Sequence, residues 1–214
     1  MEFDYCCFIS YPHGQDDVLV PFVNDLVEGL KIEIGAQSRK KVWIDYEFLR
    51  GGYRLDEEVG PGLCKSACMI LIYTPLYFDT DHTYCARELK AMQDLEEKRL
   101  CLLRDKGKGL IIPIILRGEK RFPEALKEKR LYYRFTDIEF NNPEKIRVKY
   151  AKEIKEIADY IMDVCEMLDE AAGKTPHDCA KYCLPSLDDA KRFIEVVLKR
   201  KIAEVVVPFV GRTE

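Results

Sequence analysis

Three short, almost uninterrupted apolar runs constrain the fold of this chain most. The runs are Tyr5–Ser10, Cys68–Tyr73 and Leu110–Leu116, with a shorter one at Val42–Asp45. Each has the length of a strand and lacks the alternation of a strand with one wet face, so each is typical of a strand buried on both faces. Pro113 predicts an edge position or an irregular ladder for its strand, and Leu131–Phe135 is a candidate fifth strand.

Segments with helical periodicity separate these runs. Apolar residues recur every three or four positions in several stretches, most regularly from Tyr150 to Leu168. We expect helices near residues 16–30, 55–63, 84–99, 144–168 and 186–202. Gly60-Pro61-Gly62 should break or kink the second of them. Alternating strands and helices predict an α/β, flavodoxin-like fold: a parallel five-stranded sheet with helices on both faces, plus a helical C-terminal extension.

Composition narrows the class of protein. The 214 residues are 47% hydrophobic and 34% charged, which suits one sizeable globular domain with an appendage. A net charge of −4, with acidic and basic residues interleaved, argues against a nucleic-acid partner. No run of about 18 apolar residues and no leader pattern occurs, so we expect no membrane span and a cytoplasmic location. Nine cysteines, an odd number, favour free thiols over a disulfide framework.

Residues from three predicted loops should meet at one edge of the sheet. The loops at 11–14, 46–52 and 79–83 each follow a predicted strand, and the carboxyl ends of parallel strands share the edge where ligands bind. The next helix would begin at Tyr84, whose ring projects from the same face as the Glu88 carboxylate. The topology therefore places Glu88 at the rim of a cleft, although an isolated helical glutamate is more often simply solvated.

Three motifs stand in order around these loops. They are F-I-S-Y at residues 8–11, W-I-D at 43–45 with L-R-G-G at 49–52, and Y-C-A-R-E-L at 84–89. With the fourth strand and the long last helix, they resemble the Toll/interleukin-1 receptor (TIR) domain over about residues 3–168. We therefore expect a TIR domain at 1–170 and an extension at 171–214. The resemblance implies one of two classes, because some TIR domains cleave NAD and others are adaptors that only assemble.

The resemblance also implies which residues form the site. In the enzymatic class a glutamate follows an aromatic residue, usually tryptophan, by four positions, and here Glu88 follows Tyr84. The remaining positions that would face NAD are Ser10, Tyr11, Pro12, His13, Asp45, Leu49 and Arg50. Asp45 is equally well explained as a buried structural residue, and Arg50 could meet the pyrophosphate or be solvated.

A single carboxylate suffices for the implied chemistry. Nicotinamide leaves the cationic ring nitrogen of NAD as a neutral molecule, so the acid partner of a glycosidase can be absent. The carboxylate stabilises the oxocarbenium-like ribose and orients its hydroxyls. Attack by water gives ADP-ribose, and attack by a hydroxyl or the adenine of the same molecule gives a cyclic ADP-ribose isomer. NAD is then the substrate, and we expect no cofactor and no metal.

The resemblance further implies partners and a context. The loop at 46–52 resembles the one through which TIR domains pack on one another, so we expect activity to depend on self-association. The architecture is similar to that of stand-alone prokaryotic proteins of antiphage defence, in which an effector senses a cyclic product; neither a membrane nor nucleic acid is expected as a partner. The main alternative is a non-catalytic TIR adaptor. A deoxyribosyltransferase-like enzyme lacks support from the F-I-S-Y and W-I-D segments.

Some weaker patterns have ordinary explanations. His177, Cys179 and Cys183 lack a fourth metal ligand, so packing or surface thiols explain them better than zinc. The charged run at 96–99 is expected to be the solvated end of a helix. Ser186 should cap the final helix, and Val205–Val210 is predicted to be a strand or a docking arm.

Overall fold

A parallel sheet forms the centre of the molecule. The computed structural model describes residues 3–13, 16–45, 55–79, 83–101, 107–138, 146–172 and 179–198. Its strands are β1 (Tyr5–Ser10), β2 (Lys41–Trp43), β3 (Ser66–Tyr73), β4 (Ile111–Ile115) and β5 (Tyr133–Arg134). They form a 5-stranded sheet in the order β2-β1-β3-β4-β5, and every pairing is parallel. The predicted flavodoxin-like α/β class is confirmed.

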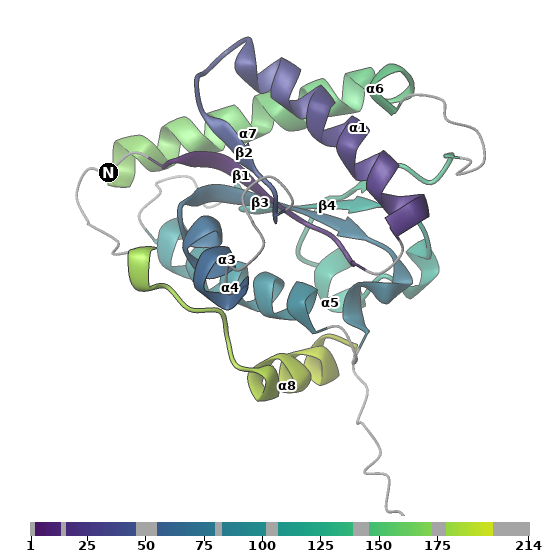
Figure 1. Ribbon diagram of the computed structural model, residues 1–214, viewed down its shortest axis with the longest axis vertical. Coiled ribbons are helices and arrows are strands. Elements are labelled where there is room, and N and C mark those ends of the chain that lie inside the picture. Colours follow the sequence, from purple (N-terminus) through teal and green to yellow (C-terminus); the bar gives the residue numbers. More distant parts are fainter. Residues whose placement is uncertain are drawn as a thin grey trace, which may run out of the picture.

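Helices cover both faces of this sheet (Figure 1). One face carries α1 (Asp16–Gly35), α6 (Ile146–Lys149) and α7 (Ala151–Ala172), and the other carries α3 (Leu55–Cys64), α4 (Tyr84–Leu100) and α5 (Glu124–Lys127). A further helix, α8 (Leu187–Leu198), packs on α4 and α5. The single helix predicted at 144–168 is divided by a turn at Tyr150. Within the described part of the chain, the helices include no candidate membrane span.

The sheet separates two apolar cores, because successive side chains of a strand point to opposite faces. On β3, Cys68 and Ile70 belong to the core beneath α7, whereas Met69 and Leu71 belong to the core beneath α4. All residues of β3 are buried. This two-sided burial explains why the strand sequence shows no alternation of polar and apolar residues.

The position of β4 corrects one expectation about Pro113. The strand lies between β3 and β5, so the edge position is wrong. The pairing with β3 runs in continuous register through Pro113, so the ladder is not irregular there, and β5 pairs with β4 only at Ile114 and Ile115. Pairing on that side begins after Pro113, where a missing N–H is tolerated.

The Gly60-Pro61-Gly62 sequence does not interrupt α3, which runs unbroken to Cys64. Both glycines instead permit close packing. A Cβ on Gly60 would lie 2.3 Å from the carbonyl oxygen of Tyr182, and one on Gly62 would lie 2.5 Å from the Trp43 ring. The predicted break is therefore wrong, because these glycines serve tertiary contacts rather than a turn.

The charged run at 96–99 is not a solvated helix end. Glu97 and Lys98 are exposed, but Glu96 is 8% and Arg99 only 1% exposed. Arg99 donates hydrogen bonds to three main-chain carbonyls between the end of α3 and the start of β3. Burial lowers the pKa of Arg99 to about 10. Half of this run is therefore part of the interior.

A disulfide joins Cys64, at the end of α3, to Cys179 in the short 3-10 helix η3 (Cys179–Lys181). The two cysteines are 115 positions apart. The other 7 cysteines are free thiols, so the expectation of free thiols is wrong for this one pair. Because Cys179 is in a disulfide, it has no free thiol for a zinc site with His177 and Cys183. The described residues contain no group of at least 3 potential metal ligands.

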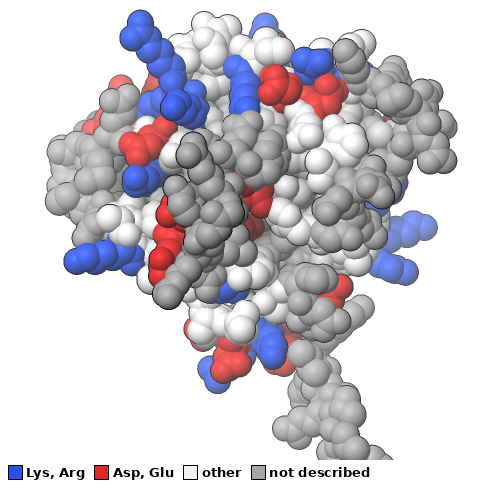
Figure 2. Space-filling view, in the orientation of Figure 1, with Lys and Arg blue, Asp and Glu red and all other residues white. Residues whose placement is uncertain are grey.

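The charged surface is mixed. On the face drawn in Figure 2, lysines and arginines alternate with aspartates and glutamates over the described residues rather than forming one broad basic patch. This distribution agrees with the interleaved charges of the sequence.

Candidate active site

Glu88 lies at the carboxyl edge of the sheet, in the first turns of α4. Its Oε2 accepts a 2.6 Å hydrogen bond from the hydroxyl of Ser10, the last residue of β1. The Ser10 hydroxyl also lies 2.7 Å from the hydroxyl of Tyr77, which belongs to the 3-10 helix η1 (Pro75–Phe78) after β3. Tyr77 is fully buried, so this short chain of hydroxyls runs from the core to the carboxyl group.

The surroundings of Glu88 favour its neutral form. Burial raises the pKa of Glu88 from 4.5 to about 8, and the Asp45 carboxylate adds to the rise. The hydrogen bond from Ser10 and the electrostatic interactions with His13 and Arg87 act in the opposite direction. Desolvation outweighs these contributions, and among the described residues no ion pair with the Glu88 carboxyl group replaces the lost water. A strongly raised carboxyl pKa at a ligand-binding edge is typical of functional sites.

A second polar cluster joins the loop that follows β1 to Asp45, which follows β2. Asp45 Oδ2 is 2.7 Å from His13 Nε2, and Asp45 Oδ1 accepts a 3.2 Å hydrogen bond from the Tyr11 hydroxyl. The rings of Tyr11 and His13 are 4.4 Å apart. The His13 side chain is 54% exposed and that of Asp45 is 17% exposed. The carboxylate therefore orients an imidazole that remains accessible from solvent.

The start of α4 places an aromatic ring against Arg87, the residue before Glu88. Tyr84, the first residue of the helix, is 38% exposed. The guanidinium carbon of Arg87 lies 5.2 Å from the centre of the Tyr84 ring. Arg87 is itself 6% exposed and donates a 2.7 Å hydrogen bond from Nε to the carbonyl of Pro185. Arg87 thus connects the surface aromatic residue to the C-terminal segment of the chain.

The structure brings most of the predicted site residues to one edge. Those that meet there are Ser10, Tyr11, Pro12, His13, Asp45, Tyr84 and Glu88. Leu49 and Arg50 lie outside the described residues. Tyr77 and Arg87 were not predicted as part of the site. Tyr77 could have been found from its place directly after the buried strand at 68–73, since loops after strands converge at this edge.

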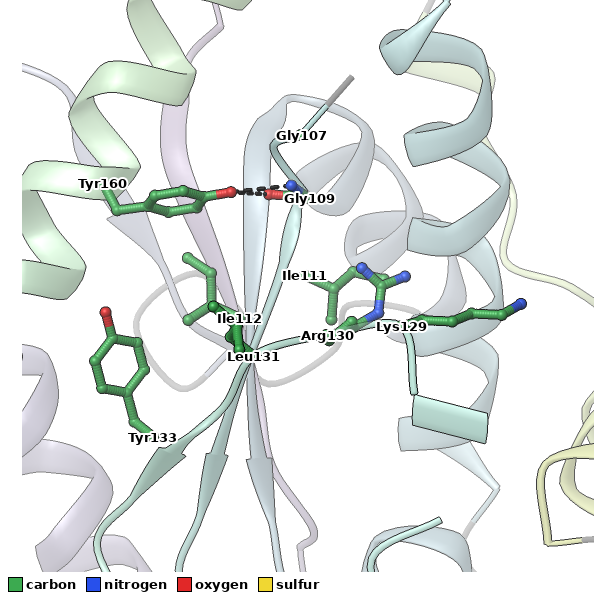
Figure 3. Close-up of a pocket in the computed structure, with 9 residues that line it drawn as sticks. All are labelled: Gly107, Gly109, Ile111, Ile112, Lys129, Arg130, Leu131, Tyr133 and Tyr160. Carbon is green, nitrogen blue, oxygen red and sulfur yellow. Dashed lines mark hydrogen bonds between the residues drawn. The ribbon is translucent and has the colours of Figure 1, made fainter. Parts of the chain in front are cut away.

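The pocket drawn in Figure 3 is a separate feature at the opposite edge. It has a volume of about 280 Å³ and lies at the amino ends of β4 and β5. The hydroxyl of Tyr160 bonds to the main chain of Gly109 on one side, and Arg130 extends along the other side (Figure 3). Of the predicted site residues that the structure describes, none lines this pocket.

The comparison with protein families accounts for the motifs at the Glu88 edge. The family model described as TIR domain matches residues 7–147, which span the motifs around Ser10, Asp45 and Glu88. The chain belongs to the TIR domain family. The TIR match ends in α6, so α7 and the C-terminal segment lie beyond it, and the predicted division near residue 170 stays a prediction.

Other comparisons give less. The chain is similar to a solved structure described as the activated Roq1 resistosome directly recognizing the pathogen effector XopQ (TIR domains). The identity is 16% and the TM-score 0.39, with 90% of this chain and 96% of that chain covered. No curated protein matches the chain.

Proposed function

We propose that this TIR domain cleaves NAD between nicotinamide and ribose, with Glu88 as the catalytic carboxylate. The observation that carries the proposal is the placement of Glu88. It lies at the carboxyl edge of a parallel sheet, receives a hydrogen bond from Ser10, and has a pKa raised to about 8. Ligands bind at this edge in such sheets, and the TIR family includes enzymes that cleave NAD.

The positive charge of the substrate complements the negative charge of ionised Glu88. The nicotinamide ring of NAD is cationic, so its binding beside Glu88 favours the ionised carboxylate and lowers the pKa of the group. The carboxylate then stabilises positive charge on ribose C1′ as the C–N bond breaks. The bonding electrons neutralise the ring, and nicotinamide leaves without a proton. The hydrogen bond from Ser10 stabilises the ionised carboxylate.

The nucleophile decides the product. Addition of water to C1′ gives ADP-ribose and a proton, whereas addition of a hydroxyl or an adenine nitrogen of the same molecule gives a cyclic ADP-ribose isomer. In this proposal NAD is the substrate, no cofactor takes part, and TIR domains self-associate to complete the site. A cyclic product would act through a downstream effector in a cytoplasmic, prokaryotic antiviral response.

Chromatography of NAD incubated with the wild-type and Glu88→Gln proteins tests the central role. Glutamine keeps the size of the side chain and removes its charge, so we expect turnover to fall by about 10²- to 10³-fold. Glu97→Gln is the matched control, because Glu97 is exposed on the same helix. Unchanged turnover in Glu88→Gln would refute the assigned role. NAD left intact by wild-type protein at high concentration would favour the adaptor alternative.

The pH dependence gives a second test. Only the ionised form of Glu88 is competent, so kcat/KM should rise about tenfold per pH unit and level off above the pKa of about 8. The profile of kcat should level off at lower pH, because the bound cation lowers the pKa of Glu88. A flat profile of kcat/KM from about pH 6 to 9 would contradict the proposal.

A further inference from the structure

The C-terminal segment 179–198 packs against the helix that carries Glu88. Its helix α8 directs Ala190, Ile194 and Val197 against α4 and α5, where they join the apolar cluster on that side of the sheet, and each of these residues is at most 5% exposed. Their spacing is that of a single helix face. Figure 1 shows α8 on the outer side of the α4 and α5 layer, away from the sheet.

Two polar contacts join this segment to one face of α4. Arg87 Nε donates to the Pro185 carbonyl at 2.7 Å, and the Tyr182 hydroxyl donates to the Ala91 carbonyl at 3.3 Å. Arg87 and Ala91 are one turn apart and share a face of the helix. Glu88 is the residue after Arg87, so a contact that fixes Arg87 also fixes the turn that carries the carboxyl group.

The Cys64–Cys179 disulfide holds the other end of the segment. Its cysteines are 2% and 9% exposed, respectively. The carbonyl of Cys64 accepts a 2.6 Å hydrogen bond from Arg99 in the last turn of α4, so the anchor is tied to the same helix. Gly60 lies under the Tyr182 carbonyl at a distance that only glycine allows. The segment is therefore fixed near both ends of α4.

We propose that the segment 179–198 positions the Glu88 helix through Arg87, and that the Cys64–Cys179 disulfide is a redox latch for this segment. The inference rests on the proposed function of Glu88 and adds a form of regulation to it. In the oxidised protein, Arg87 is a positioning residue that holds the first turns of α4 against Pro185. After reduction, noncovalent contacts alone hold the segment, and the first turns of α4 gain freedom.

The redox step needs a dithiol reductant. One dithiol supplies two electrons and two protons, the Sγ–Sγ bond breaks, and the protein gains the thiols of Cys64 and Cys179. The dithiol leaves as its own cyclic disulfide, so atoms and electrons balance. The disulfide closes a loop of more than a hundred residues, and a cross-link over so long a loop strongly restricts the conformations of the chain. Reduction removes this restriction.

Hydrogen–deuterium exchange of the full chain tests the latch without reference to activity. We compare oxidised protein with protein reduced by dithiothreitol, in which mass spectrometry verifies free Cys64 and Cys179. Amides of α8 and of the first turns of α4 should exchange roughly tenfold faster after reduction. Amides of α7 should change less than those of α8, because α7 covers the other face of the sheet.

Cysteine variants separate the latch from other thiols. The double variant Cys64→Ser, Cys179→Ser should exchange like the reduced protein without any reductant and should not respond to dithiothreitol. Cys183→Ser is the matched control, because Cys183 is a free, exposed thiol of the same segment. It should behave like the wild type in both states. Unchanged exchange in α8 after verified reduction would overturn the latch.

Arg87→Lys tests the positioning role. Lysine keeps the positive charge beside Glu88 but lacks the Nε donor and the planar group. We expect kcat to fall roughly tenfold at a nearly unchanged KM. The pH at which kcat/KM levels off should stay nearly the same. Arg87→Ala should in addition move that profile to higher pH, because the Arg87 charge lowers the pKa of Glu88. Equal kcat in Arg87→Lys and wild type would overturn the role.

The two proposals fail in distinguishable ways. If no form of the protein cleaves NAD while exchange in α8 responds to reduction, the function proposed for Glu88 is refuted and the latch is supported. If the oxidised and reduced proteins cleave NAD at the same rate and Glu88→Gln is inactive, the function is supported and the regulation by the latch is overturned.

Discussion

Helix α4 carries a glutamate near each edge of the sheet, and the two carboxyl groups differ in their hydrogen-bond partners. Glu96 Oε1 accepts hydrogen bonds from the Leu110 N–H at 2.6 Å and from Arg130 Nη1 at 2.7 Å, while Arg130 Nη2 contacts Oε2. The side chains of Glu96 and Arg130 are each 10% exposed. At the other edge, the described residues give Glu88 one hydrogen bond, from the neutral hydroxyl of Ser10.

The difference shows what balances the negative charge of each carboxylate. Glu96 has a charged bidentate partner, and such pairs form the strongest hydrogen bonds in proteins. Its negative charge is therefore balanced within the fold. For Glu88, burial outweighs its neighbours and raises its pKa to about 8. The negative charge of Glu88 costs free energy until a cation binds beside it, which is the behaviour expected of a site rather than of a structural ion pair.

The largest expected effect on stability comes from Glu96→Gln. The substitution leaves the buried guanidinium of Arg130 without an opposite charge, so the free energy of unfolding should fall by about 3 kcal/mol. Denaturant titration at neutral pH measures this as a lower midpoint with an unchanged slope. The adjacent Glu97→Gln is the control and should stay within about 0.5 kcal/mol of wild type, because Glu97 is exposed. A neutral result for Glu96→Gln would remove the contrast between the two sites.

A smaller effect of opposite sign is expected for Glu88→Gln. The folded pKa of about 8 is above the ordinary 4.5, so the folded state binds the proton more tightly than the unfolded state does. The stability that this proton contributes is complete below pH 4.5 and is lost as the pH rises through about 8. Glutamine does not ionise. The variant should therefore match wild type at acid pH and exceed it by about 2 kcal/mol at alkaline pH, after allowance for partial exposure.

Unfolding measured at several pH values on both proteins checks this second prediction. The difference between the two proteins isolates Glu88, because all other titrating groups are common to both. A difference that shrinks as the pH rises would show that the folded protein favours the ionised Glu88, and the contrast with Glu96 would then be one of degree.

Much of the fold was predictable because its determinants are local. The buried strands are apolar whatever their neighbours are, so β1 begins and ends where the apolar run does. Ser186 was predicted to cap the last helix, and its hydroxyl accepts a 3.2 Å hydrogen bond from the Asp189 N–H. The edge that gathers Ser10, Asp45 and Glu88 followed from the parallel order of the strands.

The features that sequence missed depend on distant partners. Glu96 and Arg99 read as a solvated helix end because Arg130 and the carbonyls at the start of β3 are far away in the chain. No spacing rule connects Cys64 with Cys179, since pairing needs the C-terminal segment to lie on α3. Arg87 was missed for the same reason: its role depends on the Pro185 carbonyl in that segment.

The smallest expected effect tests how the one hydrogen bond of Glu88 acts. The Ser10 hydroxyl lowers the pKa of Glu88, so Ser10→Ala should raise that pKa and move the profile of kcat/KM to higher pH. Activity at neutral pH should fall by roughly three- to tenfold and recover at alkaline pH, which corresponds to about 1 kcal/mol. Tyr77→Phe should act in the same direction but less, because Tyr77 contacts Ser10 rather than the carboxyl group. A lower plateau with an unmoved profile in Ser10→Ala would mean that the hydroxyl orients Glu88 without tuning its charge. The fold would then control the position of its unbalanced carboxylate and leave the proton equilibrium to burial alone.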